Sequence, residues 1–139
     1  MNQPDDGCGE QGSTGHSAEG SLRRQLLSDA QGNCLPMAHI AGVISREKLA
    51  DSLAAQQDLA LHTIRSLLTD GLMEIGDVLG ASDERIVPWD LSIDATMDRV
   101  YDLFVRHYDE RALWDLTIWL GLTPAGERQA HRLRGEAAD

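Results

Sequence analysis

The sequence predicts an α+β domain, with helices packed on a small antiparallel sheet, behind a disordered N-terminal tail. Three observations favour this fold. Apolar residues recur at helical spacing through 45–70 and 92–108. Two short segments, 72–78 and 114–122, carry the glycine boundaries or the apolar alternation of strands. Residues 1–36 are instead rich in glycine and poor in apolar side chains. The chain therefore divides into a leader (1–36), a domain (37–134) and a disordered C-terminus (135–139).

The leader holds six of the 13 glycines of the chain, and its composition cannot bury enough apolar surface to offset the entropy of ordering. We therefore expect it to be disordered, which makes Met37, where the apolar pattern begins, a candidate translation start. A zinc site at this end would need the residues Cys8, His16, Cys34 and His39. Their spacing matches no known zinc motif, so no metal is predicted.

The helices of the domain are indicated by caps and periodicity. Ser45 is a good N-cap for a first helix, and Asp58 for a second that ends at Gly71. The clearest helix starts near Ser92 and repeats apolar residues every three or four positions: Ile93, Met97, Val100, Phe104 and Tyr108. Thr123 and Pro124 form the N-cap and first position of a last helix.

Two strands are expected to pair. The first is 72–78, followed by a loop through Pro88. The second is 114–122, with one apolar face made of Trp114, Leu116, Ile118, Leu120 and Leu122. If 72–78 pairs with 117–122, Ile75 and Ile118 should both be buried.

The order helix, helix, glycine, strand, inserted helix, strand resembles a winged-helix domain over residues 40–130. Gly71-Leu72-Met73-Glu74 resembles the step from the family's recognition helix into its first wing strand. Leu122-Thr123-Pro124-Ala125-Gly126 resembles the step from the second wing strand into the next helix. The chain is also similar to a group of small actinobacterial proteins of unknown activity in which a helical insertion divides the wing strands.

The resemblance implies DNA binding through the helix 59–70 and an enlarged wing. The side chains that would contact DNA are His62, Arg65, Ser66 and Arg85. Winged-helix DNA binders usually carry several cations on these elements, whereas here Arg65 is the only one on the helix, and the segment 77–90 is acidic. The chain also has 12 Lys and Arg against 23 Asp and Glu, a formal charge of −11. Nucleic acid is therefore disfavoured as a partner without being excluded.

Acidic and aromatic residues offer a different function. Asp94, Asp98 and Asp102 lie on one side of the helix that starts near Ser92, where they would form either a solvated face or a docking face for a basic partner. Trp114 falls on the apolar strand face and is expected in the core. Trp89 and Trp119 form an exposed contact pair, or else the inserted helix covers Trp119.

Other classes find little support in the sequence. No apolar run approaches the roughly 20 residues that span a bilayer, and the acidic start and sparse cysteines favour the cytoplasm. No nucleophile elbow or phosphate loop is present, so we expect no enzyme, catalytic residue or cofactor. The leading interpretation is a non-enzymatic, winged-helix-like interaction module that binds an unknown protein or itself. The alternatives are a DNA-binding transcriptional regulator and a small enzyme whose catalytic carboxylates are not identified.

Overall fold

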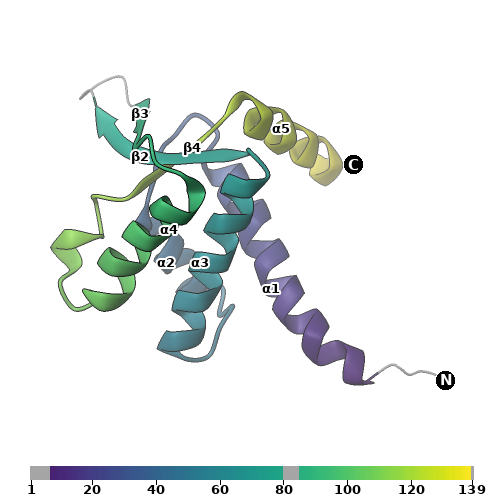
Figure 1. Cartoon of the computed structure of the whole chain (residues 1–139). Coiled ribbons are helices and arrows are strands. Elements are labelled where there is room, and N and C mark those ends of the chain that lie inside the picture. Colours follow the sequence, from purple (N-terminus) through teal and green to yellow (C-terminus); the bar gives the residue numbers. More distant parts are fainter. Residues whose placement is uncertain (1–6, 80–84, 139) are drawn as a thin grey trace.

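The computed structural model describes residues 7–79 and 85–138, with side chains described over 18–78 and 86–135. The helices are α1 (Gly7–Asp29), α2 (Met37–Arg46), α3 (Leu53–Thr69), α4 (Ile93–Tyr101) and α5 (Pro124–Ala138). The strands are β1 (Leu35–Pro36), β2 (Met73–Leu79), β3 (Arg85–Pro88) and β4 (Trp119–Leu122). The predicted α+β class is confirmed. Figure 1 shows α1 to α4 below the sheet and α5 running away from the end of β4.

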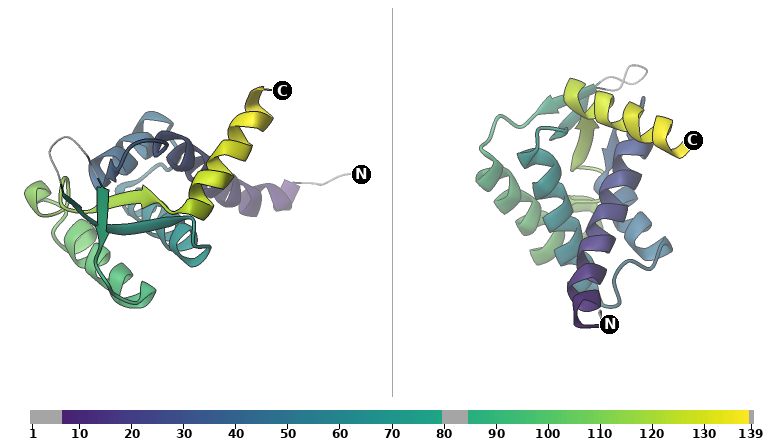
Figure 2. Two further views of the ribbon diagram at one scale, coloured as in Figure 1. Left: turned by 90° about the horizontal axis from the view of Figure 1, so that it is seen from above. Right: turned by 90° about the vertical axis from the view of Figure 1, so that its right-hand side faces the viewer.

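The sheet is antiparallel, with strand order β1-β4-β2-β3. The predicted pairing of 72–78 with 117–122 is confirmed: Ile75 lies opposite Leu120 in neighbouring strands β2 and β4. Ile75 and Ile118 are both buried, as predicted. Seen from above, the sheet lies in front of the helices, which cover its other face (Figure 2).

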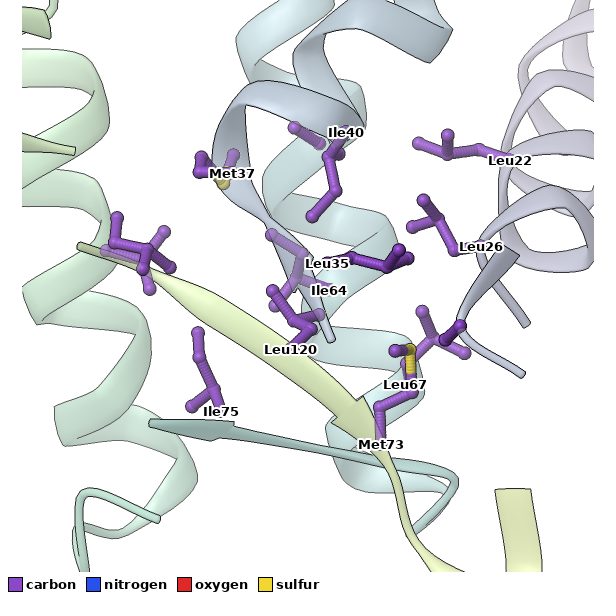
Figure 3. Packing of buried hydrophobic residues seen from close by; sticks show 14 of the residues in the cluster. Leu22, Leu26, Leu35, Met37, Ile40, Ile64, Leu67, Met73, Ile75 and Leu120 are labelled. Atoms are coloured by element: carbon purple, nitrogen blue, oxygen red, sulfur yellow. The ribbon is translucent and has the colours of Figure 1, made fainter. Parts of the chain in front are cut away.

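The core fills the space between the helices and the covered face of the sheet (Figure 3). It takes side chains from α1, β1, α2, α3, β2 and β4, among them Leu22, Leu26, Leu35, Met37, Ile40, Ile64, Leu67, Met73, Ile75 and Leu120. Because the core is assembled from several elements, none of them could bury its apolar face without the others.

The prediction of a disordered leader over 1–36 is wrong for residues 18–36, which contain the second half of α1 and strand β1. Residues from Gly7 onward form α1, and Leu22 and Leu26 are fully buried on its inner face. Spacings of about one turn give the second half of α1 an apolar stripe, and packing of that stripe against α3 and α5 outweighs the low helix propensity of glycine. At the other end of the chain, helix α5 extends to Ala138. Residues 1–6 and Asp139 lie outside the described residues.

The predicted division between the first two helices is also wrong. Ser45 lies at the end of α2 rather than at the start of a helix, and the chain turns at Lys48, which has a φ of 53°. The cap of α3 is Ser52, whose hydroxyl accepts a hydrogen bond from the Ala55 amide at 3.1 Å; Asp58 lies inside that helix. The predicted stop at Gly71 is confirmed by its φ of 71°.

Two strand boundaries differ from the prediction. The loop through Pro88 contains strand β3, which pairs with β2. The predicted strand 114–122 is a strand only at Trp119–Leu122, and Leu116 on its expected apolar face is 63% exposed. Trp114 is nevertheless buried, because its indole N–H donates to the Tyr108 carbonyl at 3.0 Å and its ring stacks on that of Tyr108. Aromatic contacts with Phe104 and Tyr108, rather than strand pairing, therefore hold Trp114 in the core.

Helices α4 and α5 begin as predicted. Ser92 caps α4 through the Ala95 amide at 3.1 Å, and α4 continues into one π-helical turn that buries Phe104. At α5, the Thr123 hydroxyl accepts from the Gly126 amide at 3.0 Å and donates to the Gly71 carbonyl at 2.6 Å. This pair of bonds joins the start of α5 to the end of α3 and sets the direction in which α5 leaves the sheet.

Candidate functional site

The candidate protein-contact and DNA-contact residues meet along one seam between α3 and α4. Arg65 on α3 donates a hydrogen bond to the carboxylate of Asp94 on α4. Asp98, one turn further along α4, lines the same seam. From the sequence alone, Arg65 and Asp94 belong to competing hypotheses. In the fold they form one surface.

The sequence of α4 explains why its carboxylates face α3. Met97 and Val100 are buried and fix the side of the helix that meets the core. At 3.6 residues per turn, Asp94 and Asp98 lie beside that side, near the line where α4 touches α3. Asp94 is also in the first turn of the helix, where the helix dipole stabilises a negative charge.

A groove of about 240 Å³ separates the exposed edges of the two helices. Its lining is a cation, a carboxylate, an imidazole, a phenol and two apolar side chains: Leu61, His62 and Arg65 from α3, and Met97, Asp98 and Tyr101 from α4. Small-molecule pockets usually measure about 300–1,000 Å³. The groove therefore suits one side chain of a partner better than a cofactor.

Exposed apolar side chains surround the acidic residues of α4. Leu91 is 46% exposed, Ile93 37% and Tyr101 44%. They alternate with carboxylates along the loop before α4 and along the helix itself. We call this surface the α4 face and define it by Asp90, Leu91, Ile93, Asp94, Asp98 and Tyr101.

The DNA-contact candidates are mostly engaged within the chain. Arg65 is held by Asp94, and the Ser66 hydroxyl accepts a hydrogen bond from Arg23 of α1. Arg23 also pairs with Asp70 at 3.0 Å. His62 is exposed and lines the groove, and the side chain of Arg85 lies outside the described residues.

Trp89 and Trp119 do not form an exposed pair. Both are half-buried, and they flank β2 on its two sides. The Trp89 indole donates to Asp77 at 3.1 Å and lies under the Arg99 guanidinium of α4, 4.1 Å from the ring centroid. The Trp119 indole donates to the Leu116 carbonyl at 2.9 Å. The inserted helix therefore covers part of Trp89 through Arg99.

Asp102, the third member of the predicted acidic stripe, lies apart from the other two. Its carboxylate is 3.9 Å from Arg106, four residues further along the chain, and 3.9 Å from His107. Such exposed pairs contribute a few tenths of a kcal/mol, about 0.3–0.5. Asp102 is thus partly neutralised within its own helix, while Asp98 has no ion pair among the described residues.

A second groove, between α1 and α5, was missed from the sequence because the leader was expected to be disordered. It measures about 580 Å³, and its lining residues are Ser21, Arg24, Gln25, Ser28, Glu47, Ala130, Leu133 and Arg134. The signal in the sequence was the spacing of Leu22, Leu26 and Ala30, which places Ser21, Arg24 and Ser28 together on the opposite side of the same helix.

Over residues 18–78 and 86–135, no three His, Cys, Asp or Glu side chains are placed to hold a metal ion together. His39, one of the four residues weighed for zinc, pairs with Asp29 at 2.7 Å. Within the part of the chain that the structure describes, none of the helices has the length and apolarity needed to cross a bilayer. Comparison with protein-family models, with curated proteins and with solved structures gave no significant match to this chain.

Proposed function

We propose that this chain is a non-enzymatic, winged-helix-like interaction module that binds a cytoplasmic protein partner through the α4 face. The observation that carries the proposal is the set of exposed apolar side chains, Leu91, Ile93 and Tyr101, interleaved with carboxylates. Exposed apolar groups rimmed by charge are typical of protein contact sites. The carboxylates favour a partner that presents basic side chains.

The order of elements supports the winged-helix-like description. Helices α2 and α3, strand β2, the inserted α4 and strand β4 follow each other in the order on which the sequence resemblance rests. Helix α3 corresponds to the recognition helix of that resemblance. In our proposal the inserted α4 lies along α3 and turns a helix suited to base contacts into one wall of a protein-binding groove.

Charge near Arg65 argues for a protein rather than DNA. The Arg65–Asp94 pair is exposed, so breaking it costs at most about 1 kcal/mol. The larger obstacle is repulsion, because a phosphate at Arg65 would lie against the carboxylates of Asp94 and Asp98. A basic side chain entering the same groove would meet those carboxylates favourably.

A retention experiment with matched variants tests the proposal. Tagged wild-type chain is incubated with lysate of the native host, and the retained proteins are compared with those retained by Leu91→Ser/Tyr101→Ser. We expect a stoichiometric protein that the wild type retains and the double variant loses. Leu116→Ser is the control, because Leu116 is a 63% exposed leucine outside the α4 face.

Equal retention by the wild type and the double variant would remove the α4 face as the binding site. Retained material that is lost on nuclease treatment would favour the DNA-binding regulator instead. Thermal unfolding of each variant is measured in parallel. All three altered positions are exposed, so we expect changes of no more than about 0.5 kcal/mol in stability.

A further inference from the structure

Charge is distributed unevenly over the fold. Residues 70–115 contain twelve acidic residues against four arginines, and the α4 face belongs to this segment. The cations Arg24 and Arg134 lie instead on α1 and α5. Among the described residues no carboxylate pairs with either of them. The chain therefore has a strongly acidic segment and, away from it, a groove lined by two arginines and one carboxylate, that of Glu47.

The two arginines outnumber the single carboxylate in the lining of this groove. Arg24 and Arg134 come from different helices and line the same α1–α5 groove. Its lining includes the apolar side chains of Ala130 and Leu133, which are buried and half-buried. Ser21 and Ser28 add hydroxyl groups along the α1 wall. A surface that fits this groove would carry carboxylates around projecting apolar side chains.

The α4 face has this composition. Its carboxylates Asp94 and Asp98 stand beside the exposed side chains of Ile93 and Tyr101. We infer that the partner of the α4 face is a second copy of this chain, which receives that face in its α1–α5 groove. This inference rests on the proposed function and names the partner. In such an assembly, the arginines of the groove on one copy contact the carboxylates of the α4 face on the next copy.

The positions of the two surfaces define the kind of assembly. Helices α4 and α1 both contact α3, and the view from above in Figure 2 shows α4 and α5 on different sides of the sheet strands. A contact between two different surfaces is heterologous and leaves one surface free on each end copy. Association therefore continues beyond a dimer and produces short chains of copies.

Ionic strength affects this association in two ways. The net charge of −11 repels two copies at long range, and this repulsion is strongest at low salt. At 0.15 M salt the screening length is about 8 Å, which leaves contact pairs such as Arg24 with Asp98 of a second copy in force. At 1 M it falls to about 3 Å and weakens those pairs too. We expect association to be strongest at intermediate salt.

Sedimentation equilibrium of the full chain tests the inference. The monomer is 15.2 kDa, and we expect the weight-average mass in 0.15 M salt to rise past twice this value as protein approaches about 1 mM, where weak contacts are populated. Asp94→Lys/Asp98→Lys reverses the sign of two charges on the α4 face, and Arg24→Glu/Arg134→Glu reverses the sign of two charges in the groove. Each variant alone should associate at least about tenfold more weakly.

Mixing the two variants separates a specific contact from general charge effects. The reversed α4 face of one variant now complements the reversed groove of the other, and the native surfaces also complement each other across the mixture. We expect the equimolar mixture to recover the mass increase that each variant alone has lost. The double controls Arg128→Glu/Arg132→Glu and Asp109→Lys/Glu110→Lys make the same changes of charge at exposed positions outside the two surfaces and should associate like the wild type.

A wild type that stays monomeric up to about 1 mM at every salt concentration would overturn the inference. Variants that associate as strongly as the wild type, or a mixture that fails to recover, would also overturn it. The proposed function is judged by a different result, the loss of a lysate protein in the Leu91→Ser/Tyr101→Ser variant. A monomeric chain that still retains such a protein would mean that the α4 face binds a different partner.

Discussion

Replacing Leu26 by alanine tests whether α1 belongs to the core. Leu26 is fully buried on the inner side of α1, beside Leu22 and facing the core shown in Figure 3. Truncation of a buried leucine removes three carbon atoms and leaves a cavity, which together cost about 2–5 kcal/mol. Small domains have a total stability of about 5–15 kcal/mol. Leu26→Ala should therefore remove a large fraction of the stability of this chain.

Urea unfolding followed by circular dichroism measures this loss. We expect a lower midpoint with an unchanged slope, since the same surface is exposed on unfolding. Arg24→Ala is the control, because Arg24 is exposed on the same helix and alanine favours helix formation; its effect should stay within about 0.5 kcal/mol. Identical midpoints for Leu26→Ala and the wild type would refute the packing of α1. We also expect the fragment 37–139, which lacks α1 and β1, not to fold alone. A folded fragment would contradict the packing of α1.

Three further substitutions test the sheet, the core and the start of α5. Ile118→Ala, and separately Ile75→Ala, should each cost about 2–5 kcal/mol in urea unfolding; no loss would exclude the pairing of β2 with β4. The Thr63 hydroxyl is buried without a hydrogen-bond partner among the described residues. Thr63→Val should therefore raise the free energy of unfolding by about 1 kcal/mol. A decrease in stability would instead indicate that the hydroxyl makes a hydrogen bond in the folded chain. A Cβ on Gly126 would lie 1.8 Å from the Leu72 carbonyl oxygen. Gly126→Ala should therefore lower the free energy of unfolding by about 1–3 kcal/mol, whereas a neutral result would contradict the close approach of α5 to Leu72.

The parts of the fold that were predicted correctly are those with a strong local signal. The helix after Ser92 has an apolar repeat and a cap, and both are present in the structure. Gly71 and Thr123 were also recognised, because a left-handed residue and an N-cap depend on only a few neighbouring residues. The β2–β4 pairing followed from two short apolar segments bounded by glycine or by Thr-Pro.

The second half of α1 was wrongly predicted to be disordered because two signals in the leader point to different structures. Its composition favours disorder, whereas the spacing of its apolar residues favours a helix. Glycine is frequent in the first half of α1, so the average composition of the leader is unfavourable for a helix. The apolar positions of the second half occupy one side of a helix, and they bury their side chains only once α3 and α5 are in place. Composition describes the isolated segment, whereas the ordering of α1 depends on contacts with residues far along the chain.

The sequence predicted individual residues of the candidate site, but not the contacts between them. Asp94, Asp98 and Arg65 were each named from the sequence, but the pair Arg65–Asp94 joins residues 29 positions apart on different helices. The contact of Arg23 with Ser66 joins residues 43 positions apart. No local pattern encodes such pairs, because they depend on how α1 and α4 pack on the two sides of α3.

A gel-shift measurement with duplex DNA tests most directly the claim that the chain binds protein rather than nucleic acid. Each phosphate that a protein neutralises adds about 0.9 to the salt slope of log affinity, and the cation of α3 lies beside Asp94 and Asp98. At low salt and micromolar protein we predict no shift for the wild type. A clear shift that weakens with added salt and disappears in Arg65→Ala would contradict the account.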